Sequence, residues 1–292
     1  MSNISVSSVK ELRQRTGLGM MDCKKALDET DGDLDKAEDL LRLKSGNKAS
    51  KLSNRVAAEG CVLININDNH SKAVILEINC ETDFVARDKS FIDFADFTSK
   101  EFLKMDESSL ELIINKVETE NQIESMRKQL VMKLGENISI RRAQLIQTES
   151  KFFSYIHNGK IAVLLDASSL DDTIGRDICM HIAAMKPLAV SQDELDSKVV
   201  ERERDLAAAK AKELGKPAEM IDKIVDGSLR KFFSEVTLLN QKFVKDDKKT
   251  IKDILDTGKI NKFLVYNLGE GIEKKDENFA EEVQSQIDSI KK

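Results

Sequence analysis

Few residues of this sequence combine the chemistry of a catalytic group with the spacing that an active site requires. The 292 residues contain no phosphate-binding loop of the GxxxxGK type, no HExxH zinc motif and no GxSxG nucleophile motif. The four cysteines lie far apart without a CxxC pair, which is typical of reduced thiols and not of a disulfide framework or a zinc site. Carboxylates are abundant, but no pair stands out as a general acid and base. We therefore predict that the protein is not an enzyme and needs no cofactor or metal.

The histidines and cysteines have more ordinary explanations than catalysis. His181 falls on the apolar face of a predicted helix and is expected in the core. His157, beside a predicted turn, could either form a local hydrogen bond or contact a partner. Cys23 and Cys80 have no base near them in the sequence, so we expect both to be small buried hydrophobic residues. The alternative is a thiol-dependent enzyme that uses one of these two cysteines and that alkylation would inactivate.

Two short segments are more suggestive of binding to another protein. Met20 and Met21 stand side by side at the start of a predicted helix. One is expected in a small core, and the other could be an adaptable exposed anchor. In the second segment, Thr82 or Asp83 can cap a helix, while Phe84 is either a hydrophobic staple or an exposed contact. Residue types alone favour the structural role in both segments and leave the binding role open.

The composition limits the possible partners and location. Hydrophobic residues make up 40% and charged residues 34% of the chain, with two prolines and no tryptophan, which favours helices around a real core. The formal net charge of -6 gives no overall attraction to nucleic acid or to an anionic membrane. The N-terminus has no signal-peptide pattern, and no apolar run is long enough to span a bilayer. These features predict a cytoplasmic protein that binds neither nucleic acid nor membrane.

The chain begins with a segment small enough to be an auxiliary binding module. In residues 1–45, apolar residues recur at helical spacing in three short stretches, separated by Thr16-Gly17 and by the polar residues 30–33. This pattern predicts a three-helix domain. Residues 46–55 lack apolar periodicity and are predicted to form a tether.

The periodicity then changes to that of strands, and it does so twice. The first half predicts a hairpin, a long helical stretch and a third strand, over residues 62–80, 90–134 and 138–143. The second half predicts a hairpin around Asn158-Gly159, then a helix around residues 178–185 and further strands up to residue 268. We therefore predict an α+β fold with antiparallel sheets and two related core subdomains, formed by residues 56–144 and by residues 145–190 with 236–268.

Residues 191–235 carry many charges and only enough apolar residues for one seam. Gly215 is expected to end a first helix and Pro217 to open a second. The residues expected to face inward are Leu195, Val199, Leu206, Ile221, Ile224 and Phe232. This pattern predicts an inserted antiparallel helical hairpin, or coiled coil, that serves self-association or a secondary contact. Residues 269–292 are predicted to form a C-terminal module with a polar helix.

Several motifs occur in order along nearly the whole chain. They are Val9-Lys10-Glu11-Leu12-Arg13, Thr16-Gly17, residues 19–27 (GMMDCKKAL), Thr82-Asp83-Phe84-Val85, Gly135-Glu136-Asn137-Ile138 with Arg141-Arg142, Tyr155-Ile156-His157, His181-Ile182-Ala183-Ala184 and Gly269-Glu270-Gly271-Ile272-Glu273. In these motifs the sequence closely resembles the translation elongation factor Ts family, the nucleotide exchange factors of bacterial-type elongation factor Tu. The N-terminal block and Thr-Asp-Phe-Val together are specific to that family.

The resemblance implies a guanine-nucleotide exchange factor whose N-terminal domain is of the ubiquitin-associated type. In that family the Thr-Asp-Phe-Val segment intrudes into the GTPase domain and disturbs its magnesium and phosphate site. By position, Asp83 and Phe84 are then the wedge, with Thr82 and Val85 beside it. The further contact residues expected with elongation factor Tu are Leu12, Met20, Met21, Ile138 and His157. A homodimer or a 2:2 complex could form through the helical hairpin.

The sequence departs from the family pattern at three positions of the second subdomain. Ala162, Lys242 and Val265 stand where the family usually has Gly, Pro and Arg. The contacts of that subdomain with elongation factor Tu are therefore less defined than the wedge. The rival interpretation is an adaptor of the ubiquitin-associated type without exchange activity, which explains residues 1–45 but leaves Thr82-Asp83-Phe84-Val85 unexplained.

Overall fold

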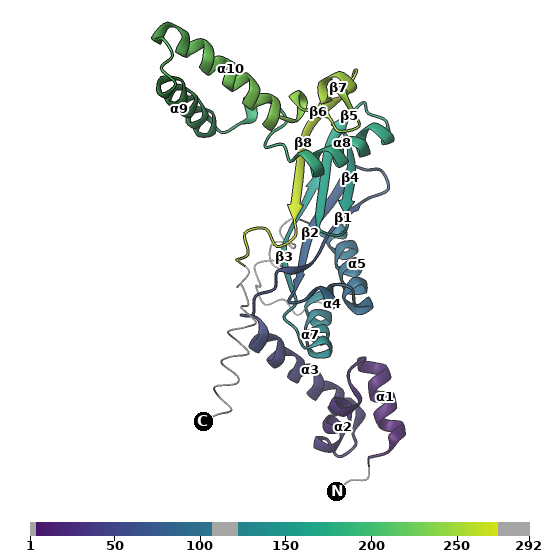
Figure 1. Ribbon diagram of the computed structural model, residues 1–292. Coiled ribbons are helices and arrows are strands. Elements are labelled where there is room, and N and C mark those ends of the chain that lie inside the picture. The colour runs from purple at the N-terminus through teal and green to yellow at the C-terminus, as the bar shows by residue number, and fades with distance from the viewer. Residues whose placement is uncertain (1–3, 107–121, 274–292) are drawn as a thin grey trace, which may run out of the picture.

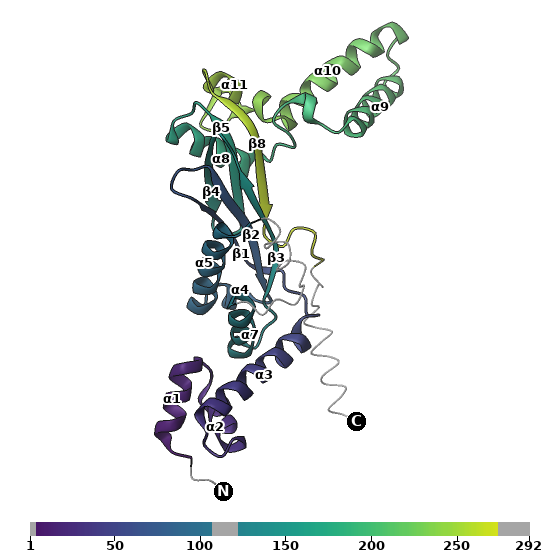
Figure 2. The same ribbon diagram turned by 180° about the vertical axis from the view of Figure 1, so that it is seen from behind.

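The computed structural model describes residues 4–106 and 122–273, and it contains both helices and antiparallel sheets, as the α+β class requires. The molecule is elongated. Three helices lie at the N-terminal end, two sheets in the middle and a helical hairpin at the other end (Figure 1). The view from behind shows the same order (Figure 2). In the described part of the chain, every helix is too short or too polar to cross a bilayer.

The three N-terminal helices share a small core of their own. They are α1 (Val6–Thr16), α2 (Met20–Glu29) and α3 (Leu34–Leu52). α1 ends at Gly17, whose φ of 68° is the left-handed conformation that glycine adopts without strain. Asp33 caps α3 by accepting hydrogen bonds from the N–H groups of Asp35 and Lys36. The residues buried between the helices are Val9, Leu12, Leu18, Cys23, Ala26, Leu27, Ala37 and Leu41.

Two three-stranded antiparallel sheets form the middle of the molecule. The first has the order β1-β2-β3 and packs against α5 and α7, with the bounds β1 (Glu59–Ile66), β2 (Lys72–Cys80), β3 (Ser139–Gln147), α5 (Lys89–Lys104) and α7 (Gln122–Leu134). The second has the order β4-β5-β8 and packs against α8, with the bounds β4 (Lys151–His157), β5 (Ile161–Ser168), β8 (Lys259–Asn267) and α8 (Asp172–Met185). Each half thus contains a hairpin, a third strand and at least one helix that covers the sheet.

The central strands β2 and β5 are buried on both faces. On one face, Val74 and Leu76 of β2 pack against α5 and α7, while Val163 and Leu165 of β5 pack against α8. The opposite faces of the two sheets meet in a second apolar cluster made of Val62, Ala73, Ile75, Ile146, Phe152, Ala162 and Leu164. Because side chains alternate along a strand, this arrangement requires nearly every residue of a central strand to be apolar.

The tether predicted over residues 46–55 is wrong for most of that stretch, because α3 continues to Leu52. Ala49 and Leu52 are buried in the core of the first sheet. The Lys48 ammonium also donates a hydrogen bond to the carbonyl of Met132 in α7, 3.0 Å away. The helical period is present in this stretch, but serine and alanine occupy two of the buried positions and give it little hydrophobic contrast. α3 therefore joins the N-terminal helices to the core as a continuous helix.

The helical hairpin consists of α9 (Ser197–Glu213) and α10 (Ala218–Val236). Its seam differs from the predicted one, since Val199 and Leu206 are 39% and 55% exposed. The residues that meet between the helices are instead Ala207, Ala211, Val225 and Leu229, flanked by Val200, Ala208, Ile221 and Phe233. Alanine at the contact allows two helices to approach closely, so the alanine face of α9 turns inward while Val199 and Leu206 stay exposed.

Short elements complete the second half, namely η1 (Gln192–Glu194), η2 (Leu238–Asn240), β6 (Lys242–Phe243), β7 (Asp246–Thr250) and α11 (Ile251–Ile254). The strands β6 and β7, together with β8, agree with the further strands predicted up to residue 268. The helix predicted over 107–121 and the C-terminal helix predicted after residue 273 lie outside the described residues.

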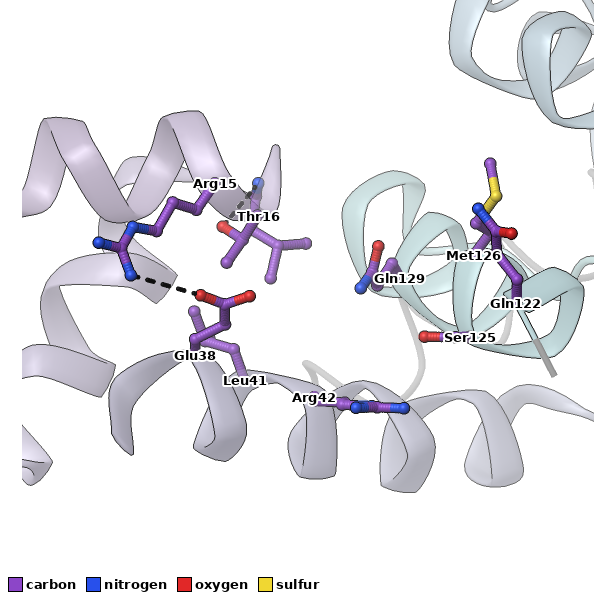
Figure 3. Close-up of a pocket in the computed structure, with 10 residues that line it drawn as sticks. Arg15, Thr16, Glu38, Leu41, Arg42, Gln122, Ser125, Met126 and Gln129 are labelled. Atoms are coloured by element: carbon purple, nitrogen blue, oxygen red, sulfur yellow. Dashed lines mark hydrogen bonds and ion pairs between the residues drawn. The ribbon is translucent and has the colours of Figure 1, made fainter. Parts of the chain in front are cut away.

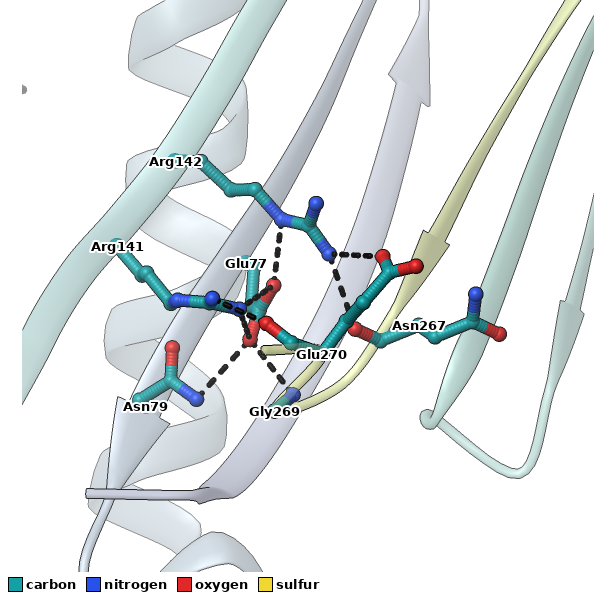
Figure 4. A network of polar contacts seen from close by, with 7 residues as sticks. All are labelled: Glu77, Asn79, Arg141, Arg142, Asn267, Gly269 and Glu270. Atoms are coloured by element: carbon teal, nitrogen blue, oxygen red, sulfur yellow. Dashed lines mark hydrogen bonds and ion pairs between the residues drawn. The ribbon is translucent and has the colours of Figure 1, made fainter. Parts of the chain in front are cut away.

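A buried carboxylate ties the end of β8 to the first sheet (Figure 4). Glu77 in β2 accepts hydrogen bonds from Arg141 at 2.9 Å, Arg142 at 2.7 Å, Asn79 at 3.1 Å and the Gly269 N–H at 2.8 Å. Burial by itself would raise the pKa of Glu77, but the hydrogen bonds from Gly269, Arg142, Asn79 and Arg141 outweigh it and hold the pKa below 4.5. Buried charge therefore helps to fix the residues after β8, in addition to the apolar packing of Leu268.

This network predicts an acid-sensitive contribution to stability. Because the folded pKa of Glu77 is lowered, its contribution is complete above the unfolded pKa, near 4.5, and is lost as the pH falls through the folded pKa. Glu77→Gln should lower the free energy of unfolding at pH 7 by about 3 kcal/mol, since two arginines lose a buried partner. The loss should shrink toward pH 3. Urea unfolding between pH 7 and pH 3 measures this loss of stability, with Glu149→Gln at an exposed position as the control. An equal loss at pH 7 and pH 3 would contradict the proposed role of the Glu77 charge.

Candidate partner-binding site

A single turn of helix presents a phenylalanine to solvent directly after β2. α4 (Asp83–Ala86) places the side chain of Phe84 82% in water. Thr82 caps the turn, and its hydroxyl accepts a hydrogen bond from the Val85 N–H at 3.3 Å. The cap predicted for Thr82 is thus confirmed, whereas the alternative that makes Phe84 a hydrophobic staple is wrong. An apolar side chain left in water at a fixed position is a candidate contact for another protein.

The residues beside Phe84 divide between anchoring the turn and facing solvent. Val85 is buried in the core of the first sheet and fastens α4 from beneath. Asp83 forms an ion pair with Arg87 at 2.8 Å; the Arg87 side chain is 80% exposed and the Asp83 side chain 46%. An exposed pair of this kind contributes little to stability. Asp83 and Phe84 are therefore the parts of the motif that a partner can reach, and Val85 is not.

A carboxylate on a distant turn holds the start of α4. Glu136, between α7 and β3, accepts hydrogen bonds from the N–H groups of Glu81 and Thr82 at 3.1 and 3.0 Å and from the Thr82 hydroxyl at 2.6 Å. The residue-by-residue prediction did not find this role, because Gly135-Glu136-Asn137 indicated only the end of a helix. The nearest indication of this role in the sequence was that these residues belong to one of the motifs that carry the family resemblance.

The exposed methionines of α2 form a second candidate contact. Met20 and Met21 are 58% and 62% exposed, so the expectation that one of them lies in the small core is wrong. Leu12 and Ile138 were expected among the contact residues, yet both are fully buried. Leu12 fills the core of the three N-terminal helices and Ile138 that of the first sheet, so neither can touch a partner in this conformation.

His157 lies exposed at the end of β4. Its ring nitrogens lie 2.9 Å from the Tyr155 hydroxyl and 3.3 Å from the Asn158 side-chain nitrogen. The local hydrogen bond is thus present, and the exposed ring also leaves a partner contact open. His181 is a core residue, as predicted: it is fully buried, its Nδ1 accepts from the Val244 N–H, and burial lowers its pKa.

The thiol groups lack the features of nucleophiles. Burial raises the pKa of the Cys80 thiol to about 12, and the nearby Glu136 carboxylate acts in the same direction. Burial likewise raises the pKa of Cys61 to about 12. Cys23 has no exposed surface. Neither of the two cysteines considered for a thiol enzyme therefore presents a reactive thiolate to solvent. Within the described residues, no three His, Cys, Asp or Glu side chains are grouped so that they could hold a metal ion.

A polar cleft of about 400 Å³ lies between α1, α3 and α7, beside the place where α3 packs against α7 (Figure 3). Its lining consists of Arg15, Thr16, Leu18, Glu38, Leu41, Arg42, Gln122, Ser125, Met126 and Gln129. Arg15 is already engaged there, since it lies 3.8 Å from Glu38 and 3.0 Å from Asp35. The exposed methionines and Phe84 do not line this cleft, so the candidate contacts lie elsewhere on the surface.

Comparison with known proteins gives the class and then the family. The pattern of the family described as Elongation factor TS matches residues 81–270. Proteins named Elongation factor Ts from Nitrosomonas eutropha and Nitrosospira multiformis are each 46% identical to all of this chain, over 100% and 98% of their own lengths. The one from Methylobacillus flagellatus is 46% identical over 97% of this chain and 98% of its own. These matches define a translation elongation factor. The chain belongs to the elongation factor Ts family, as its sequence motifs had indicated.

Two phenylalanines a few residues apart provide a test of the exposed position. Phe84→Ala should change the free energy of unfolding by less than about 0.5 kcal/mol, because the side chain is already in water. Phe91→Ala removes a fully buried ring from the first sheet's core and should cost about 3–5 kcal/mol. Thermal and urea unfolding of both variants measures the difference. A Phe84→Ala protein that unfolds as easily as Phe91→Ala would place Phe84 in the core.

Proposed function

We propose that this protein is a cytoplasmic guanine-nucleotide exchange factor of translation elongation, which binds elongation factor Tu in its GDP form and promotes release of the GDP. Asp83 and Phe84 insert next to the magnesium and phosphate site of the GTPase and favour a conformation in which its ligands are displaced. The observation that carries this proposal is the solvent-exposed Phe84 on a capped turn. Family membership supports the choice of partner.

The wedge needs help from other contacts. Full burial of a phenylalanine side chain stabilises a complex by only about 1.5–3 kcal/mol. Turning a mostly occupied nucleotide site into a mostly empty one requires a differential of about 5.5 kcal/mol between the two states. Met20, Met21 and His157 are the exposed side chains available as additional anchors.

The path of α3 supports binding through the Phe84 wedge together with additional anchors. The helix begins among the three N-terminal helices and ends in the core of the first sheet, with Lys48 bonded to α7. Met20 and Phe84 are thereby held in one arrangement before any partner binds. A preorganised pair of contacts loses less conformational entropy on binding than two contacts on a flexible tether.

Linkage between ligands distinguishes exchange from simple adaptor binding. If the wedge disturbs a magnesium–phosphate site, this protein weakens the binding of GDP and magnesium to elongation factor Tu. Because coupling is reciprocal, GDP and magnesium must weaken the binding of this protein to elongation factor Tu by the same free energy. In the limit of mutual exclusion, each tenfold rise in free GDP above its dissociation constant lowers the apparent affinity about tenfold. Calorimetric titration of the two proteins across GDP and magnesium concentrations measures this antagonism.

The matched control for that titration is Phe84→Ala, in which the dependence on GDP and magnesium should become weaker. An adaptor bound at a remote surface would show the same affinity at every GDP and magnesium concentration, since a ligand indifferent to two states shifts neither. A flat series for the wild-type protein would therefore rule out exchange even if the two proteins bound tightly.

The helical hairpin is proposed to act apart from nucleotide release, in self-association or in a 2:2 complex. Its base is closed, because the Leu188 N–H donates to the Val236 carbonyl and the Leu238 N–H donates to the Ala189 carbonyl, at 2.8 and 2.9 Å. Residues 191–235 can therefore be replaced by a short Gly/Ser linker without pulling the base apart. The exposed Leu206 gives its outer face an apolar contact.

We expect this replacement to change the oligomeric state, or the lifetime of the complex, while the rate of GDP release at saturating factor changes by less than about twofold. Light scattering and nucleotide-release kinetics on the same preparations measure the two properties. Loss of GDP release with unchanged partner binding would show that the hairpin takes part in exchange.

A further inference from the structure

The direction in which Phe84 points cannot come from its own packing. Its side chain is 82% exposed, and α4, which carries it, has only four residues. A single helical turn is unstable by itself, because it fixes several backbone dihedrals for one hydrogen bond. Val85 and the partly buried Ala86 hold the inner side of the turn against the core of the first sheet, but these apolar contacts do not fix the direction of the backbone that leads into it. A second restraint at the start of α4 is needed.

Glu136 supplies that restraint through both of its carboxylate oxygens. Oε2 accepts from the N–H groups of Glu81 and Thr82, at 3.1 and 3.0 Å, and Oε1 accepts from the Thr82 hydroxyl at 2.6 Å. Hydrogen bonds to an ionised acceptor are shorter and stronger than those between neutral groups. The two residues that precede α4 are thus fixed by a side chain more than fifty residues further along the chain.

The Thr82 hydroxyl transmits this restraint into the turn. A hydroxyl has one proton to donate, and Thr82 donates it to Glu136. Its lone pairs are then directed to the Val85 N–H, which donates to the same oxygen at 3.3 Å and closes the cap of α4. Glu136 therefore sets the orientation of the hydroxyl that starts the turn on which Phe84 stands.

A reciprocal bond strengthens the same junction and extends it to α3. The Asn137 N–H donates to the Glu81 carboxylate at 2.6 Å, while the Asn137 side chain donates to the carbonyls of Ser53 and Arg55 at 3.3 and 2.8 Å. Arg55 also lies 3.5 Å from the Glu81 carboxylate. The end of α3, the end of β2 and the turn before β3 are joined in one polar junction.

We propose that Glu136 is a positioning residue of the exchange site, which fixes the turn of Phe84 in the orientation that inserts into the GTPase; the proposal rests on the function proposed above. Glu136 touches no nucleotide and acts only through Thr82 and Phe84. Its removal should leave Phe84 present but differently held.

The test uses the full-length protein with Glu136→Gln, which removes the charge and one acceptor oxygen but keeps the size of the side chain. Thr82→Val, which removes the hydroxyl and keeps the shape, is the second variant should Glu136→Gln fold poorly. Glu149→Gln makes the same charge change at an exposed position outside the junction and is the control.

The first readout does not involve the GTPase. Amide hydrogen exchange at Glu81, Thr82 and Val85 should become about tenfold faster in Glu136→Gln, the effect of losing one hydrogen bond to a charged acceptor. Amides of the β4-β5-β8 sheet should exchange as in the wild type. Turn amides that keep wild-type protection would overturn the proposal directly.

The second readout is a double-mutant cycle on GDP release from elongation factor Tu. Glu136→Gln should reduce stimulated release about tenfold in the wild-type background and by no further factor in a Phe84→Ala background, because the two residues act as one unit. An equal reduction in both backgrounds would mean that Glu136 acts independently of Phe84 and would overturn the proposal. So would full stimulation by Glu136→Gln.

The two possible failures can be told apart. If the Phe84→Ala variant stimulates GDP release from elongation factor Tu at the wild-type rate, the proposed wedge is wrong, whatever the effect of Glu136→Gln. The amide exchange measurement still decides whether Glu136 holds the turn. If Phe84→Ala is impaired while Glu136→Gln is not, the wedge stands and the positioning role of Glu136 falls.

Discussion

An apolar side chain that lies in water cannot be positioned by its own packing, so its position depends on the backbone that carries it. Phe84 has this constraint, and the structure around it is arranged accordingly. Val85 is buried below the turn, Thr82 caps it, and the Glu136 carboxylate holds both the cap and the preceding backbone. Charged hydrogen bonds suit this task because they fix direction as well as distance, which apolar packing does not.

The same use of buried charge recurs between the two halves of the core. Glu77 collects two arginines, an amide and a backbone N–H, and it fixes the residues that follow β8 against the first sheet. Asp166 stands at the matching place of β5, where it accepts from Thr148 and Asn261. In both strands the register shifts directly after the acid. The two central strands thus share a register shift directly after a buried acid.

Where buried residues follow a simple period, the sequence alone was sufficient to predict the helices and strands. The three N-terminal helices, the two hairpins and the paired helices around Gly215-Lys216-Pro217 all have clear apolar spacing and turn residues, and they were predicted. Prediction failed where small residues make the contact. Ala49 continues α3 through the expected tether, and Ala207 replaces Leu206 in the hairpin seam. A hydrophobicity pattern cannot distinguish an alanine that packs closely from one that faces water.

The candidate site divides in the same way. Thr82 as a cap follows from its side-chain chemistry, whereas the exposure of Phe84 could be argued only from the family resemblance. Leu12 and Ile138 belong to the motifs that carry the resemblance, yet they are buried and support the fold instead of the contact. The role of Glu136 needs a contact between residues far apart in the chain, which no local pattern reveals.

The most direct test of the account is the rate of GDP release from elongation factor Tu at saturating concentrations of this protein. Stopped-flow fluorescence with labelled GDP gives that maximal rate separately from affinity. The account predicts that Phe84→Ala lowers the maximal rate by at least about tenfold, because the wedge acts in the displaced state and not only in binding. A Phe84→Ala protein that reaches the wild-type maximal rate, merely at higher concentration, would contradict it.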